Sequence, residues 1–323
     1  MSTKTFLVTG GSGFVGRALI GQLLASAHCR VVALSRRAET AVDPSVRTVQ
    51  WSGLDSGQDL SEALQGVDCV VHTAARVHVM NEVTADPLAA FRQVNVRGTL
   101  ELARQAAAAG VRRFIFVSSI KVNGEGTAPG CVYTADDLPA PVDPYGISKH
   151  EAEQALQSLA LDTGMEVVII RPVLVYGPGV KANFLSMMRW LDRGVPLPFG
   201  AVDNRRSLVA LDNLVDLVLT CIEHPAAANQ IFLASDGDDV STTRLLRLLA
   251  AAMGRTARLL PVPVALMDGA ARMLGRSALA QRVFGSLQVD ISKNQRLLNW
   301  VPPVTLDRAL QRTAQHFLDT RQT

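Results

Sequence analysis

A glycine-rich turn near the amino terminus constrains this chain more than any other feature. The apolar run Phe6–Thr9 leads into Gly10-Gly11-Ser12-Gly13-Phe14-Val15-Gly16, and a helical pattern follows over residues 17–27. Strand, glycine loop and helix in this order are typical of a dinucleotide-binding βαβ unit, because glycines permit the tight turn and a close approach of the backbone to a pyrophosphate. The predicted cofactor contacts in this turn are Gly10, Ser12, Gly13, Phe14, Val15 and Gly16.

The residues after the second predicted strand, 30–34, bear on which dinucleotide is bound. An acidic residue at this place binds the ribose 2′-hydroxyl of NAD, whereas arginine accommodates the 2′-phosphate of NADP. The chain has Ser35-Arg36-Arg37 here and no acidic residue before Glu39. We therefore expect NADP(H) as the favoured cofactor, with NAD(H) as the alternative. Two arginines on an exposed loop are the plainer explanation of the same residues.

The middle of the chain carries Pro144-Tyr145-Gly146-Ile147-Ser148-Lys149 at the start of a predicted helix that continues to Leu161. Tyr145 and Lys149 are four residues apart, so they lie on one face of that helix. A nearby ammonium favours the phenolate and lowers the pKa of a tyrosine, which suits the pair for moving a proton to or from a substrate oxygen. The spacing also arises by chance, and it gains weight from the dinucleotide pattern upstream.

Strands and helices alternate over the first half of the chain, which predicts an α/β fold with a doubly wound parallel sheet. After residue 172 this alternation gives way to a mixed region rich in proline, glycine and helices. We assign residues 1–172 to a Rossmann-type cofactor domain, to which 205–235 are expected to return. We assign residues 173–204 and 236–323 to a smaller C-terminal α/β lobe that binds substrate.

Polar residues follow two of the buried strands of the predicted sheet. His72 ends the strand over residues 67–75, and a packing role is favoured over catalysis for it. Ser118 and Ser119 follow the strand over 113–117, where a hydroxyl can hydrogen-bond a substrate oxygen next to a tyrosine. Serines at strand ends are often simple caps, so this interpretation depends on Tyr145 and Lys149.

Composition excludes several other classes of protein. The net charge is only +3 and no basic run is interleaved with aromatic residues, so nucleic acid is not an expected partner. The four cysteines are far apart and show no metal-ligand spacing, which favours reduced thiols in the cytoplasm and predicts no metal site. The apolar stretch Leu259–Leu274 is interrupted by Pro261, Pro263 and Asp268, so we expect a buried or groove-lining helix and no membrane partner.

Taken together, these motifs resemble the extended short-chain dehydrogenase/reductase family, in particular its nucleotide-sugar branch. The matching segments lie at residues 9–16, 72–75, 95–99, 118–119, 145–149, 171–172 and 176–178, in the order that the family has them. Weaker matches continue to Pro302. The resemblance implies a UDP-sugar substrate and a homodimer formed through the helix with Tyr145 and the helix before it. The alanine-rich faces 100–109 and 152–161 permit such contact, although packing within one chain explains them equally well.

The resemblance also implies roles for individual residues. Tyr145 would be the acid and base, Lys149 would tune its pKa and bind the ribose, and Ser119 would polarise the substrate oxygen. Further cofactor contacts are implied at Thr73, Ala74, Ala75, Asn95, Ser118, Arg171 and Pro172. Substrate contacts are expected at Arg76, His78, Lys121, Asn183, Pro198, Arg205 and Arg282, with arginine suited to a diphosphate.

The family includes several chemistries, which the residues after Ser119 help to separate. Its 4,6-dehydratases have an Asp-Glu pair there, whereas this chain has Ile120 and Lys121, so a dehydratase is disfavoured. We expect reduction of the C4 ketone of a UDP-4-keto-6-deoxy-hexosamine by NADPH, in the synthesis of surface polysaccharide precursors. The alternatives are an NAD-dependent UDP-hexose 4-epimerase and, from another class, a non-catalytic NADP-sensing regulator.

Overall fold

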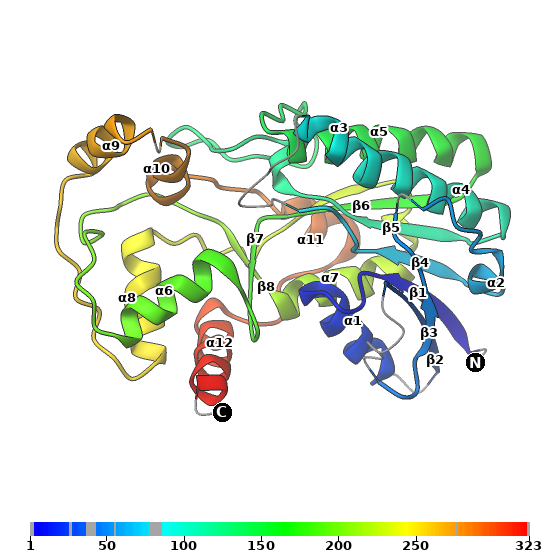
Figure 1. Cartoon of the computed structure of the whole chain (residues 1–323), viewed down its shortest axis with the longest axis horizontal. Coiled ribbons are helices and arrows are strands. Elements are labelled where there is room, and N and C mark those ends of the chain that lie inside the picture. The colour runs from blue at the N-terminus through cyan, green and yellow to red at the C-terminus, as the bar shows by residue number, and fades with distance from the viewer. Residues whose placement is uncertain are drawn as a thin grey trace.

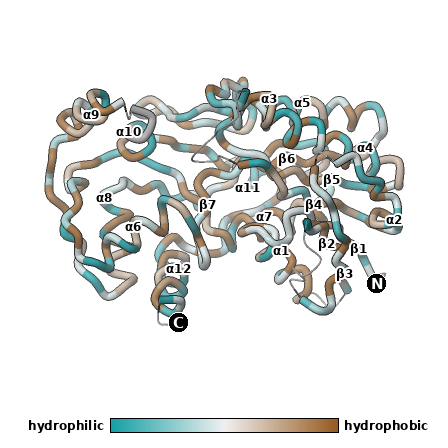
Figure 2. The backbone as a smooth tube through the Cα atoms, viewed as in Figure 1, coloured by the Kyte–Doolittle hydropathy of each residue, from teal (hydrophilic) through white to brown (hydrophobic). Residues whose placement is uncertain are grey.

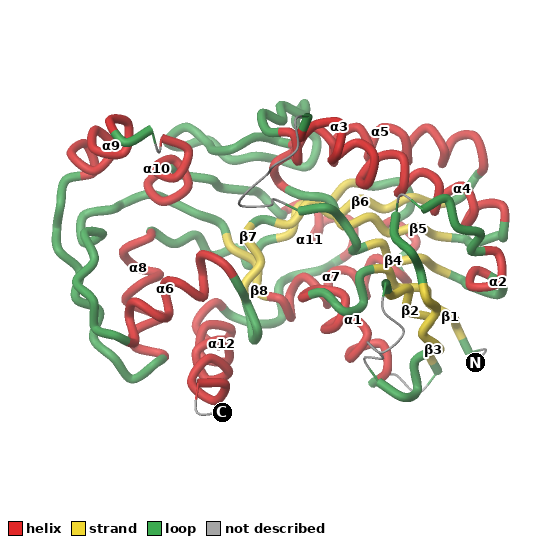
Figure 3. Tube along the Cα trace, in the orientation of Figure 1, coloured by secondary structure: helices red, strands yellow, loops and turns green. Residues whose placement is uncertain are grey.

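The computed structural model describes residues 3–25, 28–36, 43–54, 56–77, 86–275 and 277–321. Within these residues, seven strands form one sheet in which every pairing is parallel (Figures 1 and 3). In spatial order the strands are β3 (Arg47–Gln50), β2 (Cys29–Ser35), β1 (Lys4–Thr9), β4 (Cys69–His72), β5 (Arg113–Val117), β6 (Glu166–Pro172) and β9 (Ile231–Ala234). This is the doubly wound Rossmann-type sheet that the sequence predicts.

Helices cover both faces of the sheet (Figure 1). One face carries α2 (Ser61–Leu64), α3 (Pro87–Phe91), a π-helical segment (Arg92–Gly98), α4 (Thr99–Ala108) and α5 (Pro144–Thr163). The other face carries α1 (Phe14–Leu24) and α7 (Leu211–Glu223). The chain direction across the sheet reverses between β1 and β4, so the carboxyl ends of these two strands form the switch point at which such sheets bind ligands.

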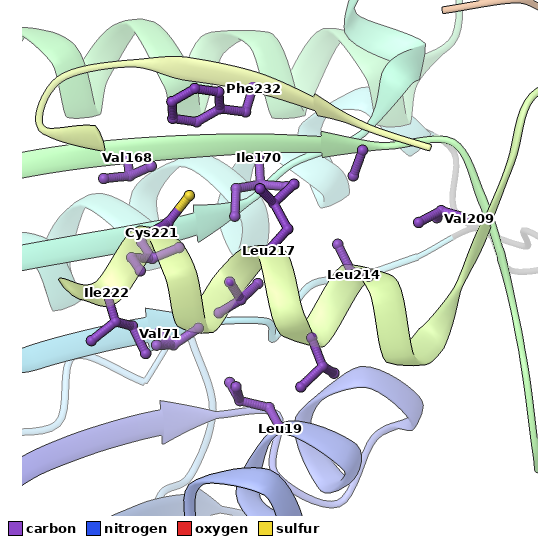
Figure 4. Close-up of a cluster of buried hydrophobic side chains, with 14 of the residues drawn as sticks. Leu19, Val71, Val168, Ile170, Val209, Leu214, Leu217, Cys221, Ile222 and Phe232 are labelled. Atoms are coloured by element: carbon purple, nitrogen blue, oxygen red, sulfur yellow. The ribbon is translucent and has the colours of Figure 1, made fainter. Parts of the chain in front are cut away.

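Alternating side chains of each strand explain why both faces are covered. Leu7 and Phe114 belong to the apolar cluster with α4 and α5, whereas Val8 and Ile115 belong to the cluster with α1 and α7. Successive residues of a strand point to opposite faces, so a continuous apolar strand needs helices on both sides. Figure 4 shows how side chains of α7, among them Leu217, point toward the strands.

The remaining elements form a second part of the molecule beside the sheet. Strands β7 (Leu174–Tyr176) and β8 (Leu208–Ala210) make a separate parallel pair. The helices are α6 (Ala182–Asp192), α8 (Thr242–Ala252), α9 (Val264–Met273), α10 (Ser277–Phe284), α11 (Ser292–Leu298) and α12 (Leu306–Arg321), and single 3-10 turns occupy Ile120–Val122 and Pro225–Ala227. A third apolar cluster joins α6, α8 and α12.

The two predicted domains do not have fully separate hydrophobic cores. Strand β9 pairs with β6 in the main sheet, so the chain returns from the second part to the first. Leu298 and Trp300 also pack into the cluster beneath the sheet, although they belong to the range 236–323 that we assign to the substrate lobe. The boundaries of the two domains therefore stay a prediction.

Of the two alternatives expected for Leu259–Leu274, a buried or a groove-lining helix, the buried one is wrong. No residue of α9 is buried, and Leu266, Met273 and Leu274 are 67%, 91% and 72% exposed. The helix lies at the opposite end of the molecule from the amino terminus (Figure 1), and the colours of Figure 2 mark several of its residues as hydrophobic. Apolar composition alone does not reveal whether a neighbouring element covers a helix face. Among the described residues, no helix is long and apolar enough to cross a membrane.

Candidate active site

The glycine turn between β1 and α1 is shaped to admit a ligand against its backbone. Gly10 has a φ of +70°, which an L side chain rarely adopts, and its carbonyl oxygen accepts a hydrogen bond from the Gly13 amide at 2.8 Å. A Cβ atom on Gly16 would lie 2.3 Å from that same oxygen. The first N–H groups of α1 have no partner within the helix and carry the positive end of its dipole. The geometry of the turn is compatible with a pyrophosphate, and cofactor binding there stays a prediction.

The end of β2 contains part of the segment that bears on the 2′-position of the ribose. Ser35 is buried and its carbonyl oxygen accepts a hydrogen bond from the Trp51 amide at 2.8 Å, whereas Arg36 is exposed. Arg37 and Glu39 lie outside the described residues. The described part thus presents one exposed cation, Arg36, directly after the strand, and the preference for NADP(H) stays a prediction.

His72 is a packing residue at the end of β4. Its ring nitrogens lie 2.7 Å from the Thr9 hydroxyl and 3.0 Å from the Thr99 hydroxyl, and its ring stacks on Phe116 with centroids 5.8 Å apart. Burial lowers its pKa to about 3, so the ring is neutral. A tautomer with the proton on Nε2 satisfies both contacts. His72 thereby fixes the Thr9 hydroxyl, which accepts a hydrogen bond from the Ala74 amide at 3.2 Å.

Asn95 holds the loop that follows β4 against the neighbouring helices. Its side chain accepts a hydrogen bond from the Arg76 amide at 2.8 Å and donates to the Arg76 carbonyl and the Ser148 hydroxyl, both at 3.0 Å. Thr73 and Ala74 are placed by Thr9, and Ala75 lies between these two attachments. Asn95 therefore shapes the loop, and its direct contact with a cofactor stays a prediction. His78 lies outside the described residues.

Tyr145 lies at the first turn of α5, where the local sequence fixes the start of the helix. The Asp143 carboxylate accepts a hydrogen bond from the Gly146 amide at 2.7 Å, and Pro144 occupies the first helical position. The Tyr145 hydroxyl is hydrogen bonded to Ser119 from the end of β5. The structure therefore brings together the predicted acid and the predicted polarising hydroxyl, which are 26 residues apart in the sequence.

The pKa of Tyr145 moves in the direction opposite to the one expected from its spacing to Lys149. Burial and the negative charge of Asp143 raise the pKa to about 12, and the hydrogen bond from Ser119 lowers it less. The Lys149 ammonium donates instead to the Val117 carbonyl at 2.8 Å and lies 4.0 Å from the centroid of the Phe116 ring. Tyr145 is thus held as a neutral phenol, which is the proton-donating form.

Lys149 is itself buried beside these residues. Burial lowers its pKa to about 7, and the charge of Glu153, one helical turn further along α5, opposes that change. At neutral pH the side chain therefore stands near the midpoint of its titration. A buried lysine with a pKa in this range is typical of functional sites.

Arg171 and Ser118 belong to a buried network behind the site. The Arg171 guanidinium binds both oxygens of Glu153, with Nη2 2.6 Å from Oε2, and donates to Asn123 at 3.0 Å. The Ser118 hydroxyl donates to Glu153 as well. Sequence reasoning missed Glu153, although its position four residues after Lys149 places it on the same helix face. The polar groups of Ser118 and Arg171 are hydrogen bonded within this network, and Pro172 is buried. Contacts of these three residues with a cofactor therefore stay predictions.

Lys121 is held by two carboxylates near the start of α5. Its ammonium binds Glu125 at 2.7 Å and forms an ion pair with Asp143, the residue that caps α5. Asp143 is a second residue that sequence reasoning missed, although an Asp-Pro step before a helix is a recognisable N-cap signal. The contact of Lys121 with substrate stays a prediction, but its place beside the Tyr145 turn is now explained.

The residues expected to bind substrate in the second lobe are spread over several elements. Asn183 is exposed at the start of α6, Pro198 is half-buried, and Arg205 and Arg282 are exposed. Arg206, which the sequence interpretation left out, is the more buried of the two neighbouring arginines and donates to the Gly285 carbonyl at 3.0 Å. A substrate role of these residues stays a prediction.

Comparison with known proteins decides the family. The model of the "NAD dependent epimerase/dehydratase family" matches residues 6–234. The chain belongs to this family. It is 49% identical over 316 residues to a UDP-glucose 4-epimerase of Vibrio cholerae, covering 98% of this chain and 96% of the relative. It is 28% identical to a GDP-6-deoxy-D-mannose reductase of Pseudomonas aeruginosa, covering 96% and 95% of the two chains.

Solved structures of epimerases have the same fold. A UDP-glucuronic acid 4-epimerase from Bacillus cereus in complex with NAD superposes with a TM-score of 0.79 at 20% identity, covering 98% of this chain and 99% of that chain. As a member of the epimerase/dehydratase family, the chain is an extended short-chain dehydrogenase/reductase of the nucleotide-sugar epimerase and reductase branch. It is an enzyme of this branch rather than a non-catalytic sensor of dinucleotides.

The residues at the carboxyl edge of the sheet suit the nicotinamide dinucleotide after which the family is named. The glycine turn leaves its backbone open to a pyrophosphate, the loop after β4 is fixed beside it by Thr9 and Asn95, and Lys149 of α5 reaches the carboxyl end of β5 at Val117. These segments meet at the carboxyl ends of parallel strands, where cofactors bind in such sheets. Among the described residues, no group of three or more His, Cys, Asp and Glu side chains could hold a metal ion.

Proposed function

We propose that the enzyme uses NADPH to reduce the C4 ketone of a UDP-4-keto-6-deoxy-hexosamine. The observation that carries this proposal is the neutral, partly buried Tyr145 phenol hydrogen bonded to Ser119, a pair arranged to donate a proton to a developing alkoxide. The exposed Arg36 directly after β2 supports NADPH, which a reductase consumes and must exchange in every turnover.

In this mechanism the protein residues position the ketone and supply the proton. The hydride for the carbonyl carbon comes from the bound nicotinamide cofactor. Ser119 donates a hydrogen bond to the carbonyl oxygen and so stabilises the charge that develops there. Tyr145 gives its proton to the alkoxide. The charged form of Lys149 then stabilises the phenolate that is left behind, until Tyr145 is reprotonated.

Lys121 supports reduction over elimination of water. In this chain a cation, tied to Glu125 and Asp143, occupies the place where the 4,6-dehydratases of the family have a carboxylate. A carboxylate that removes a proton from carbon must be free to accept it. Both neighbouring carboxylates are instead engaged with Lys121, which leaves ketone reduction without a following elimination.

The second candidate is a UDP-hexose 4-epimerase with tightly held NAD. The 49% identity to a protein named UDP-glucose 4-epimerase favours it. An epimerase oxidises C4 and returns the same hydride, so Tyr145 would have to act first as a base. Its raised pKa opposes that first step.

Identification of the bound nucleotide separates the two candidates. The purified protein would be denatured, and any released nucleotide would be identified and measured. The affinities for NADPH and NADH would then be compared in the wild type, in R36A and in R30A, since Arg30 is an exposed arginine within β2. We expect the purified protein to retain little NAD and to bind NADPH more tightly than NADH. This preference for NADPH should be lost in R36A and kept in R30A. Stoichiometric NAD that survives purification would favour the epimerase.

Assembly and location are further expectations of this proposal. We expect a homodimer acting on UDP-sugars in the cytoplasm. Leu102 and Ala106 of α4 and Ala152 and Leu156 of α5 are buried against the sheet of their own chain, so a dimer would have to use the remaining faces of these helices. The mass in solution, measured by light scattering, tests the dimer.

A further inference from the structure

Glu153 is a buried carboxylate that pairs with the Arg171 guanidinium behind the active site. Its side chain and that of Arg171 are each 2% exposed. Arg171 Nε lies 3.0 Å from Oε1 and Nη2 lies 2.6 Å from Oε2, and the Ser118 hydroxyl donates to Oε1. A buried carboxylate is costly unless all its oxygens are paired, and both oxygens of Glu153 are.

The network connects the three segments that carry the catalytic groups. Glu153 and Lys149 are one turn apart on α5, Ser118 adjoins Ser119 at the end of β5, and Arg171 lies near the end of β6. Arg171 also reaches Asn123, just after the turn that contains Lys121. A displacement of Glu153 would therefore move the hydroxyl of Ser119 relative to the helix that holds Tyr145.

The charges around Lys149 make Glu153 decisive for its protonation. The neighbours of Lys149 on α5 are Tyr145, a neutral phenol, and Glu153. From β5 it contacts the Val117 carbonyl and the Phe116 ring. The side chain of His72 on β4 is neutral, Arg171 on β6 is a second buried cation, and Asp143 at the start of α5 is tied to Lys121. Arg171 is thus paired directly with Glu153, whereas Lys149, one turn earlier on α5, is affected by the negative charge of Glu153 without an ion pair to it.

We propose that Glu153 is a positioning residue that, through its bonds to Ser118 and Arg171, fixes the Ser118–Ser119 strand end against α5 and supplies the negative charge nearest to the Lys149 ammonium on that helix. Tyr145, Lys149 and Glu153, spaced four residues apart, then form a line along one face of α5 from the surface of the site to its buried support. Glu153 touches neither substrate nor cofactor. This inference rests on the proposed role of the Tyr145–Lys149 pair, but not on which sugar is the substrate.

Direct titration of Lys149 tests the inference without any assay of activity. The chain has only five lysines, so protein labelled with ¹³C at lysine Cε gives a short NMR spectrum, in which K149M identifies the signal of Lys149. The titration midpoint would be compared in the wild type, in E153Q and in E151Q. Glu151 is the matched control, because it is a partly exposed carboxylate on the same helix that pairs with Arg92.

We expect the midpoint of Lys149 to fall by about one to two pH units in E153Q and to stay unchanged in E151Q. The alkaline limb of the kcat profile should move to lower pH by the same amount, while the affinity for NADPH stays within about twofold. A folded E153Q in which the Lys149 midpoint does not move would overturn the inference. If only its melting temperature falls, the role of Glu153 is purely structural and the inference is likewise wrong.

The shorter variant E153D keeps the test decisive if E153Q does not fold. Its carboxylate is withdrawn from Ser118 and Lys149 by one methylene, so we expect a smaller downward shift of the Lys149 midpoint. Folded E153D with the wild-type midpoint would count against the inference. If the wild type does not reduce keto-sugars but the Lys149 midpoint still shifts in the variants, the proposed function is refuted and the role of Glu153 stands.

Discussion

Tyr145 and Ser119 are hydrogen bonded to each other although they come from different elements of the fold. Tyr145 occupies the first turn of α5, and Ser119 follows β5. The carboxyl end of a strand and the amino end of the helix that covers it meet at the same edge of a parallel sheet. The pair therefore combines a proton donor with a hydroxyl that can polarise the same substrate oxygen.

Removal of the Tyr145 hydroxyl should collapse turnover. We expect Y145F to lower kcat by about 10²- to 10⁴-fold, because the proton donor is lost, with NADPH affinity nearly unchanged. Y133F is the control, since the Tyr133 hydroxyl donates to the Gly126 carbonyl at 2.7 Å and has no part in the proposed chemistry. Stopped-flow measurement of hydride transfer checks the prediction, which fails if Y145F retains wild-type rates.

The rate of reduction should depend on pH through Lys149. Its folded-state pKa is about 7, so the ammonium that stabilises the phenolate is present below that pH and lost above it. Tyr145 stays protonated across the neutral range, because its pKa is raised to about 12. We expect kcat for reduction to fall as the pH rises through about 7. A profile that is flat up to about pH 9 would contradict this assignment.

The neutral state of His72 should make the stability of the fold depend on pH. Its pKa is about 3 in the folded state against 6.5 unfolded, so the contribution is complete above pH 6.5 and is lost as the pH falls toward 3. The free energy of unfolding should decrease by about 1.4 kcal/mol for each pH unit in that window. We expect H72N to show a weaker slope than the wild type in urea unfolding, whereas H28N at an exposed position should keep the full slope.

Arg113 should contribute more to stability than its neighbour Arg112. The Arg113 side chain is buried, pairs with Glu166 at 2.7 Å and donates to the carbonyls of Ile222 and His224 at the end of α7, both at 3.0 Å. We expect R113M to lower the free energy of unfolding by about 2–3 kcal/mol, because the carbonyls at the end of α7 lose their buried charged donor. R112A, with a half-exposed side chain, should cost less than about 1 kcal/mol. Equal losses in urea unfolding would refute the distinction.

A methyl group in the glycine turn should block cofactor binding. In G16A the new Cβ would lie 2.3 Å from the Gly10 carbonyl oxygen, so the turn must shift away from the pyrophosphate position. We expect NADPH affinity to fall by at least about tenfold, as measured by fluorescence titration. G21A on the same helix meets nothing within 4 Å and should bind NADPH normally, with a gain in stability of up to about 1 kcal/mol. Equal affinities of the two variants would rule out the proposed fit.

Much of this fold follows from patterns that are local in the sequence. The run Phe6–Thr9 before the glycine turn, and Asp143-Pro144 before the helix of Tyr145, specify where elements begin because strand, turn and cap preferences depend on neighbouring residues. The alternation of strands and helices was enough to predict the parallel sheet, and the spacing of Tyr145 to Lys149 was enough to predict that both lie on one helix face.

Tertiary structure decided what surrounds those residues, and with it their chemistry. The spacing predicted a lowered Tyr145 pKa, but burial and Asp143 raise it, since desolvation depends on segments far away in the chain. The exposure of α9 and the pairing of Glu153 with Arg171 were likewise invisible in local patterns. The sequence by itself determined the elements and the reactive residues, whereas burial and charge neighbours, which only folding brings together, determined their protonation and their partners.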